Sequence, residues 1–510
     1  MGLKKIQQEA QENNAQSMVK LGRLYLSGVG VDLDEKEAYQ WFEKASNLNN
    51  DEAKTYLAYM YANGIGVKED PKKALDIYLK ASELGDATAS YTLGVIYKKG
   101  LCDEEIDMKK AQDFFEKAAK QNHPGAQYEL ALPQAKEGFM LMDKVDAESI
   151  AKGSEIFKKV EPIFKKAADL NIVPAKYALA ILYSKSQDVD KQKMSSELFK
   201  ACAKENINSA YMALAYIYDK GIGVEQDYWK SLRYYQRAYE RGNKKAILNI
   251  IYANIMGLGC KQSYQNAINM SRDAVNAGVK EANYFAGVCF KHGLSVDKNL
   301  EKAEELFSYA ADAKYPPALY QLGVFNDPFY GIGKDGKMAV RYYTEAYELG
   351  MLDAGAELAR IKFGEDKAKY LKMLEDLAKA DTVKAAYYLA EKYSKGEDVA
   401  KDDNKAFECY KKAACLGLRS AIDKVVEIAQ KKGDKALVAE YKAKNLEGMD
   451  FKQMLSVAED CMDVKNCELA AYCYAMSAQV ADSSSKQEKI LDLIGDKFEK
   501  GEDGIWKGKE

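Results

Sequence analysis

Histidine is nearly absent from this chain, which has two in 510 residues, His123 and His292. A catalytic imidazole needs an orienting partner and a nucleophile within reach, and neither histidine has such a group close by in the sequence. Both fall at expected turns or helix ends, where a surface role is the simpler interpretation. We therefore predict that the protein is not an enzyme and has no catalytic residues.

Grouped metal ligands are missing as well, because the sequence contains no C-x-x-C and no H-x-x-x-H motif. Cys461, Cys467 and Cys473 are six residues apart. A step of six turns a helix by roughly 240° beyond a full turn, so these thiols spread over different faces. The nine cysteines are odd in number and scattered. They fit reduced thiols better than a disulfide framework, and we predict no metal and no cofactor.

An excess of one charge and a long apolar run are also absent. Lys and Arg number 75 against 78 Asp and Glu, which leaves no surplus of positive charge to hold a nucleic acid. The most apolar window, residues 469–481, is too short and too polar to span a bilayer. The N-terminus turns polar where a secretory signal would be apolar. We predict a cytoplasmic protein without membrane insertion, and delivery into a host cell stays open.

Proline is scarce, with 8 residues, whereas Ala, Lys, Glu and Leu are abundant and tyrosine reaches 36. This composition favours helices packed through small and aromatic side chains. One stretch, "NGIGVKEDPKKALDIY" at 63–78, pairs two glycines ahead of an expected helix start, an arrangement that can cradle phosphate. The stretch returns as "SGVGVDLDEKEAYQWF" from Ser27 and "KGIGVEQDYWKSLRYY" from Lys220. A phosphate loop occurs once per site, so we interpret the recurring glycines as a turn between helices.

A small residue that opens a helical stripe returns along the chain, mostly in steps of 36 residues, with exceptions of 37, 49, 35 and 31. These anchor residues are Ser17, Ala53, Ala89, Ala126, Ala175, Ala210, Ala246, Ala282, Ala318, Ala354, Ala385 and Ala421. A fixed period of this length with two helical patterns per unit is typical of an α-solenoid. We predict an all-α, right-handed α-solenoid (superhelix) of about 12 antiparallel helix-pair repeats.

Helix caps are predicted at a constant distance from the anchors. Seventeen residues after an anchor stands a residue type whose side chain caps a helix N-terminus. The predicted caps are Asp34, Asp70, Asp227, Ser263, Asn299, Asp335 and Asp402. Each cap marks the expected start of the second helix of its repeat.

Three units depart from the pattern. The Ala126 unit, about 126–174, has about 13 extra residues and carries Pro133 where its first helix should continue. Either its helices are lengthened or a segment within 133–162 is inserted. The Ala318 unit reads "VFNDPFYGIGK", and its proline should end the first helix early. The Ala354 unit has a shortened turn.

We predict two regions, a repeat solenoid over residues 1–444 and a C-terminal cap over 445–510. The cap is expected to comprise a degenerate helix pair and a terminal half-repeat, because Ile494, Gly495, Phe498 and Gly501 restore the repeat offsets from Ile490. A solenoid must cover the apolar face of its last unit, which is the expected role of this region. Trp506 could dock on the cap or bind a partner.

The recurring positions follow the pattern A-x-x-x-L-G-x-x-Y-x-x-G-x-G-V-x-x-D-x-x-K-A-x-x-x-Y-x-K-A-x-x-x-G, most clearly in the units opening at Ser17, Ala53, Ala89, Ala210, Ala282 and Ala385. The chain resembles the Sel-1-like repeat family, a tetratricopeptide-like group built from antiparallel helix pairs. The resemblance covers roughly residues 15–430. It implies an adaptor or scaffold for protein complexes, with members in signalling, quality control and bacterial host interaction.

By analogy with tetratricopeptide repeats, the resemblance implies that offsets 2 and 6 from each anchor face an inner, concave surface. Offset 2 comprises Tyr91, Tyr128, Tyr177, Tyr284, Tyr320 and Tyr387, and offset 6 comprises Arg23, Tyr59, Tyr216, Tyr252 and Arg360. Such tyrosines offer rigid apolar area with a hydrogen-bonding tip, which suits a protein or peptide partner. Alternatively, the offset-2 tyrosines pack adjacent units.

The sequence therefore predicts a non-catalytic scaffold or adaptor that binds a protein or peptide along the concave face. The alternative hypothesis is a regulatory receptor that senses a peptide or small ligand, including the case of a bacterial host-interaction effector. An enzyme of a new kind is the third reading. The sequence shows no convergent acid, base and nucleophile that would support this hypothesis.

Overall fold

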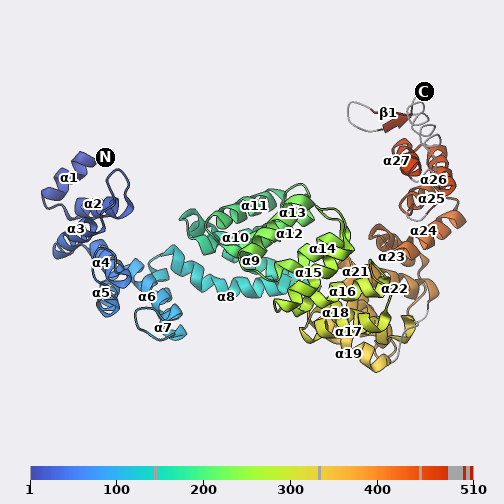
Figure 1. Ribbon diagram of the computed structural model, residues 1–510, viewed down its shortest axis with the longest axis horizontal. Coiled ribbons are helices and arrows are strands. Elements are labelled where there is room, and N and C mark those ends of the chain that lie inside the picture. The colour runs from blue at the N-terminus through green and yellow to red at the C-terminus, as the bar shows by residue number, and fades with distance from the viewer. Residues whose placement is uncertain are drawn as a thin grey trace. The chain divides into compact units, whose positions relative to one another are not determined.

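A computed structural model describes residues 2–142, 144, 146–330, 335–396, 398–446, 449, 451–479, 498–500 and 506–508. Within these residues, 27 α-helices follow one another as a series of pairs (Figure 1). Two short 3₁₀ helices, η1 (Lys280–Ala282) and η2 (Pro328–Tyr330), and two short strands complete the described elements. The predicted all-α solenoid is confirmed.

One helix, α1 (Leu3–Gln11), precedes the repeats. The first helices of the successive pairs are α2 (Ala15–Ser27), α4 (Asp51–Asn63), α6 (Ala87–Lys99), α8 (Pro124–Met142), α10 (Val173–Ser184), α12 (Asn208–Lys220), α14 (Ala246–Met256), α16 (Asn283–His292), α18 (Pro316–Asn326), α20 (Leu352–Lys362), α22 (Val383–Lys395), α24 (Arg419–Lys432) and α26 (Phe451–Asp463). The second helices are α3 (Glu35–Asn47), α5 (Pro71–Glu83), α7 (Met108–Lys120), α9 (Ala147–Asp169), α11 (Val189–Lys204), α13 (Tyr228–Glu240), α15 (Tyr264–Asn276), α17 (Leu300–Asp312), α19 (Gly336–Glu348), α21 (Lys367–Lys379), α23 (Asp403–Cys415), α25 (Lys435–Ala443) and α27 (Cys467–Gln479).

The chain divides into two compact units. The first comprises Met1–Lys144, Glu148–Ala253 and Gly257–Lys261, and the second comprises Val145–Ala147, Asn254–Met256 and Gln262–Glu510. Within each unit, helices that are adjacent in the sequence pack against each other. Each unit therefore has a series of small hydrophobic cores, each formed by helices that are neighbours in the sequence, as expected for a repeat protein.

Small residues of the first helices allow the two helices of a pair to approach closely. The alanine anchors are fully buried, for example Ala89 and Ala318 at 0% exposure. Five residues after Ala89 stands Gly94, where a Cβ atom would lie 2.5 Å from the Phe115 ring of α7. An aromatic side chain of the second helix thus fills the space above a small residue of the first. This contact explains the repeated small residue in the sequence pattern.

All seven predicted caps are confirmed. Each predicted side chain accepts a hydrogen bond from a backbone N–H in the first turn of a second helix, as Asp70 does from Lys73. Capping satisfies donors that the helix itself leaves unpaired. The caps therefore mark the starts of second helices, as the period predicts.

The second glycine of three pairs permits close packing between neighbouring repeats. Gly66 has a φ of +65°, and a Cβ atom there would lie 2.2 Å from the carbonyl oxygen of Glu35 at the start of α3. Gly223 and Gly259 approach the backbone of the preceding second helix in the same way. The interpretation of these stretches as turns is confirmed, because each lies between the two helices of a pair, as Gly66 lies between α4 and α5.

The departing units keep the helix-pair plan. The Ala126 unit has lengthened helices, since α8 has 19 residues and α9 has 23, with Pro133 and Pro162 inside them. In the Ala318 unit, α18 ends at Asn326, two residues before Pro328, as predicted. In the Ala354 unit, Asp366 caps α21 after the shortened turn.

The C-terminal residues differ from the predicted terminal half-repeat. Helices α26 and α27 form the expected degenerate pair, but strand β1 (Phe498–Lys500) pairs antiparallel with β2 (Trp506–Gly508), which lies against α27. The prediction of a terminal helix reaching Gly501 is therefore wrong at Phe498, which lies in a strand. The sequence between the strands, "GEDGI", is rich in turn-forming residues, which favour a hairpin. Ile490, Ile494, Gly495 and Gly501 lie outside the described residues.

Candidate functional site

The six predicted tyrosines at offset 2 lie against the second helix of their own repeat. Tyr128 and Tyr320 are buried, at 4% and 9% exposure, and the others are half-buried. Their rings contact the aromatic side chain that fills the pair. These ring pairs are Tyr91–Phe115, Tyr128–Phe164, Tyr177–Phe199, Tyr284–Phe307, Tyr320–Tyr343 and Tyr387–Tyr410, with centroids 5.2–5.8 Å apart. Packing within the repeat thus occupies the rings of the offset-2 tyrosines.

The offset-6 residues behave differently. Tyr59, Tyr216 and Tyr252 are 45%, 52% and 46% exposed. Arg23 is exposed as well, whereas Arg360 is half-buried. The four exposed residues line pockets of the first unit. Offset 6 therefore supplies the accessible side chains of the first-helix face, by which we mean the surface that the first helices of successive repeats present.

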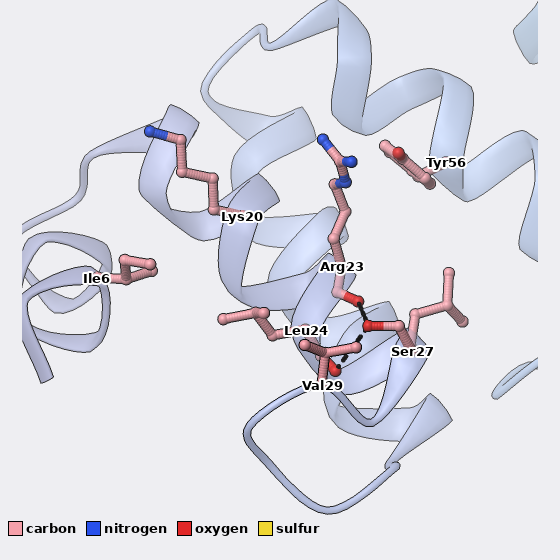
Figure 2. A pocket seen from close by; sticks show the side chains of 8 residues that line it. Ile6, Lys20, Arg23, Leu24, Ser27, Val29 and Tyr56 are labelled. Atoms are coloured by element: carbon pink, nitrogen blue, oxygen red, sulfur yellow. Dashed lines mark hydrogen bonds between the residues drawn. The ribbon is translucent and has the colours of Figure 1, made fainter. Parts of the chain in front are cut away.

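Two pockets that share Tyr56 form what we call the N-terminal groove, on α1, α2, α4, α5 and α6. The first pocket, of about 500 Å³, is lined by Ile6, Lys20, Arg23, Leu24, Leu26, Ser27, Val29 and Tyr56. Figure 2 shows the Lys20 and Arg23 side chains extending toward the same end of this pocket, away from Leu24 and Val29. The second pocket, of about 460 Å³, is lined by Glu52, Thr55, Tyr56, Tyr59, Tyr78, Asp86, Thr88 and Thr92.

A further pocket of about 320 Å³ brings Tyr216 and Tyr252 together between α12, α13 and α14. Asp219, Lys220 and Asn249 supply its polar lining. Lys220 pairs with Asp219 at 2.9 Å, and this hydrogen bond raises the pKa of the lysine. The pocket repeats the combination seen at Tyr59, an exposed tyrosine beside polar groups.

In the second unit, Tyr320 and Arg360 meet around a buried carboxylate. Glu357 on α20 is 0% exposed. It accepts hydrogen bonds from Lys384 Nζ at 2.5 Å, Arg360 Nε at 2.9 Å and the Tyr388 hydroxyl at 3.0 Å, and from the hydroxyl of Tyr330. Lys384 also donates to the hydroxyl oxygens of Tyr320 and Tyr330, and Arg360 pairs with Asp327. We call these seven residues the Glu357 cluster.

Opposing effects act on the Glu357 carboxyl. Burial raises its pKa, but the charge and hydrogen bond of Lys384, together with hydrogen bonds from Tyr330 and Arg360, outweigh burial and hold the pKa below its usual value. Burial and the Glu357 charge raise the pKa of Tyr320 and Tyr330. Glu357 therefore stays ionised and its tyrosine partners stay protonated at neutral pH. The cluster fastens η2 and α18 to α20 and α22.

Some residues of the first-helix face are absent from the predicted set. The N-terminal groove includes Lys20, Tyr56 and Thr92 at offset 3, and Glu52 and Thr88 one residue before their anchors. Glu357, Lys384 and Tyr388 hold the same two offsets in the second unit. Offsets −1, 3 and 6 follow the i, i+4, i+7 spacing of one helix face. That spacing is the signal that could have located them.

The remaining candidates for chemistry are held apart. His123 stacks on Tyr91, its Nδ1 accepts from the Ala126 N–H, and burial lowers its pKa. His292 ends α16. Among the described residues, no group of three His, Cys, Asp or Glu side chains could hold a metal ion. None of the helices that the structure describes is long and apolar enough to cross a membrane.

Seven stretches of the sequence match the Sel1 repeat model, at residues 15–50, 51–86, 87–123, 208–243, 280–315, 316–351 and 383–418. The chain is a Sel1 repeat protein. Each matched stretch contains one helix pair, as 51–86 contains α4 and α5.

Among curated relatives, this Sel1 repeat protein is 27% identical over 236 residues to the chitin synthase regulator SKT5 of Saccharomyces cerevisiae, covering 45% of this chain and 33% of SKT5. It is 26% identical over 155 residues to protein SHC1 of Saccharomyces cerevisiae, covering 30% of this chain and 25% of SHC1. The chain thus spans a quarter to a third of the length of these relatives.

Two solved structures are similar. The first is c5321, a protective antigen of uropathogenic Escherichia coli, at 21% identity and a TM-score of 0.40 over 97% of both chains. The second is a Sel1 repeat protein of Oxalobacter formigenes, at 22% identity and a TM-score of 0.30, covering 70% of this chain and 90% of that chain.

Proposed function

We propose that this Sel1 repeat protein is a non-catalytic scaffold whose first-helix face binds a segment of a partner protein, with the N-terminal groove as the main site. The observation that carries this proposal is the exposure of Tyr59, which is 45% accessible in a pocket of about 460 Å³. A tyrosine offers a large apolar area, loses little conformational freedom on binding and can hydrogen-bond through its hydroxyl.

The surroundings of Tyr59 support this function. Apolar area from Tyr56 and Tyr78 lies beside three threonine hydroxyls in the same pocket. Binding sites combine a mainly apolar lining with a few polar groups that fix orientation. The relative SKT5 is named as a regulator of chitin synthase, which is itself a protein. A regulatory role in that relative agrees with the proposed scaffold.

Site-specific photo-cross-linking tests the proposal. A photoreactive phenylalanine analogue placed at Tyr59 or Tyr216 in the full chain should form cross-links to a partner in cells that express the protein. The matched control is Tyr239, which is 40% exposed on the second helix α13. Cross-links of equal yield at Tyr239 and Tyr59, or none at Tyr59 and Tyr216, would contradict the first-helix face as the binding surface.

A further inference from the structure

The sign of charge reverses along the N-terminal groove. The first pocket contains two cations, Lys20 and Arg23, and no acidic side chain among the described residues that line it. The second contains two anions, Glu52 and Asp86, and no basic side chain among its described lining residues. Tyr56 lines both pockets and lies at the point where the sign changes.

The positive end is available to a ligand. Lys20 is exposed, and it has no ion-pair partner in the part of the chain that the structure describes. Arg23 contacts Glu52 at 3.7 Å, with 57% of the arginine side chain and 41% of the glutamate side chain exposed. Exposed ion pairs contribute little free energy, so a carboxylate of a ligand can replace Glu52 beside Arg23 at small cost.

Apolar side chains accompany the two cations. Ile6, Leu24 and Val29 line the same pocket as Lys20 and Arg23. In Figure 2, Leu24 and Val29 lie on the opposite side of the pocket from the Lys20 ammonium and the Arg23 guanidinium, and Ile6 lies at the left of the view. An acidic residue of a ligand that reaches the cations would therefore place an adjacent aliphatic side chain over these apolar groups.

The negative end is partly satisfied. One Asp86 oxygen accepts from the N–H groups of Thr88 and Ala89 at 2.7 and 3.0 Å, and the other accepts from the Thr55 hydroxyl at 2.8 Å. These partners hold the carboxylate in place and leave its charge uncompensated by a cation. With Glu52 nearby, a lysine or arginine beside Tyr59 meets two negative charges and an aromatic ring.

We infer that the N-terminal groove selects an extended partner segment that has an acidic residue next to an aliphatic one, and a basic residue about three positions away. The spacing follows from neighbouring helices, which lie on the order of 10 Å apart, and from an extended chain, which advances about 3.3 Å per residue. This inference rests on the proposed scaffold function and adds the chemical class of its partner.

The test uses the full chain and fluorescent peptides measured by fluorescence polarisation. One peptide carries Leu-Glu followed by two alanines and Lys, and a second has the same composition with Glu and Lys adjacent. We expect at least tenfold tighter binding of the first peptide and weaker binding as salt rises, because exposed charges are screened. Equal affinities for the two peptides would overturn the inference.

Charge-reversal variants sharpen this test. Lys20→Glu should lower the affinity for the first peptide at least fivefold. The double variant Lys20→Glu, Arg23→Glu makes both ends of the groove negative, so it should prefer a peptide in which Lys replaces the Glu of the first peptide. Lys72→Glu, an exposed residue of α5 on the second-helix side, is the control and should bind like the original chain. Circular dichroism and thermal unfolding verify the fold of each variant. If the double variant fails to fold, Lys20→Glu alone still tests the positive pocket, because Lys20 has no ion pair among the described residues that the substitution would break.

The two proposals fail in distinguishable ways. If Tyr59 cross-links a partner but the peptides bind equally, the partner class is wrong and the scaffold stands. If neither Tyr59 nor Tyr216 cross-links, the scaffold proposal itself fails. Unchanged affinity in Lys20→Glu, with preserved fold, would overturn the role of the positive pocket.

Discussion

At the scale of single residues, Glu357 concentrates several interactions on one buried carboxylate of the second unit. Its two oxygens accept four hydrogen bonds, two of them from charged side chains, in a fully buried position. A buried charge is tolerated only when partners compensate the loss of water. Removal of Glu357 would therefore leave Lys384 without its buried counter-charge, whereas Arg360 would keep Asp327.

Glu357→Gln should lower the free energy of unfolding by about 3 kcal/mol, because Lys384 and Arg360 lose a buried counter-charge. Chemical denaturation of the variant and the original chain measures this difference. Glu427→Gln is the control, since Glu427 pairs with Lys424 and Lys431 at half-exposed positions on one helix face. An unchanged midpoint in Glu357→Gln would show that the Glu357 cluster contributes no net stability.

The stabilisation by Glu357 should also depend on pH. The folded protein holds the pKa of Glu357 below its usual 4.5. A carboxyl with a lowered folded-state pKa contributes its full stability above the unfolded pKa and loses it as the pH falls through the folded value. The difference in unfolding free energy between the original chain and Glu357→Gln should be constant from pH 7 to about pH 5 and shrink below about 4.5. A difference that grows on acidification would contradict the lowered pKa.

At the scale of elements, the turn between the two helices of a repeat is the device that joins repeats. Gly30 and Gly66 occupy equivalent places in consecutive turns, with φ of +78° and +65°. A Cβ atom at Gly66 would overlap the Glu35 carbonyl, whereas one at Gly30 would meet nothing within 4 Å. Both glycines allow a left-handed backbone without steric strain. Of these two, only Gly66 also permits close contact with a preceding second helix.

Gly66→Ala should therefore destabilise the protein more than Gly30→Ala. The shared left-handed conformation costs about 1–2 kcal/mol in each variant. The overlap with Glu35 adds about 1–3 kcal/mol for Gly66→Ala alone. Hydrogen exchange of the amides in α3, α4 and α5 measures the effect, with Gly30→Ala as the matched control. Equal exchange rates in the two variants would contradict a role of Gly66 between repeats.

At the scale of the whole molecule, stability is distributed over local cores, each shared between neighbouring helices. The residues near the C-terminal end of the second unit illustrate this. Ala439, Ala443 and Leu446 are 1–4% exposed and belong to a core that also includes Met454 of α26 and Ala470 of α27. Helices α26 and α27 thus cover an apolar face of α25.

Deletion of residues 445–510, the predicted cap, should uncover that apolar face. We expect stronger fluorescence of a hydrophobic dye such as ANS and a lower midpoint of thermal unfolding, because exposed apolar surface is no longer shielded from water. Substitution of the exposed Tyr472 by Ser, which keeps the cap, is the control. A deletion variant with unchanged dye binding and midpoint would contradict the cap.

The sequence by itself determined the helix pairs and their boundaries. Caps such as Asp70, stops such as Gly64 and the spacing of the alanine anchors act within a few residues, so they can be found without knowledge of the fold. The early end of α18 before Pro328 follows from the same local chemistry. The predicted terminal helix failed at Phe498, where pairing with a second strand overrode the repeat offsets.

Only the tertiary structure decided which side chains face outward and which charges meet. The rotation of a helix against its partner buries Tyr128 and exposes Tyr59, although both belong to the predicted set. The Glu357 cluster joins residues from 320 to 388 on four elements, and the N-terminal groove joins α1 with repeats further along the chain. Such contacts depend on how helices pack, because burial and charge compensation are set by neighbours in space and not by neighbours in sequence.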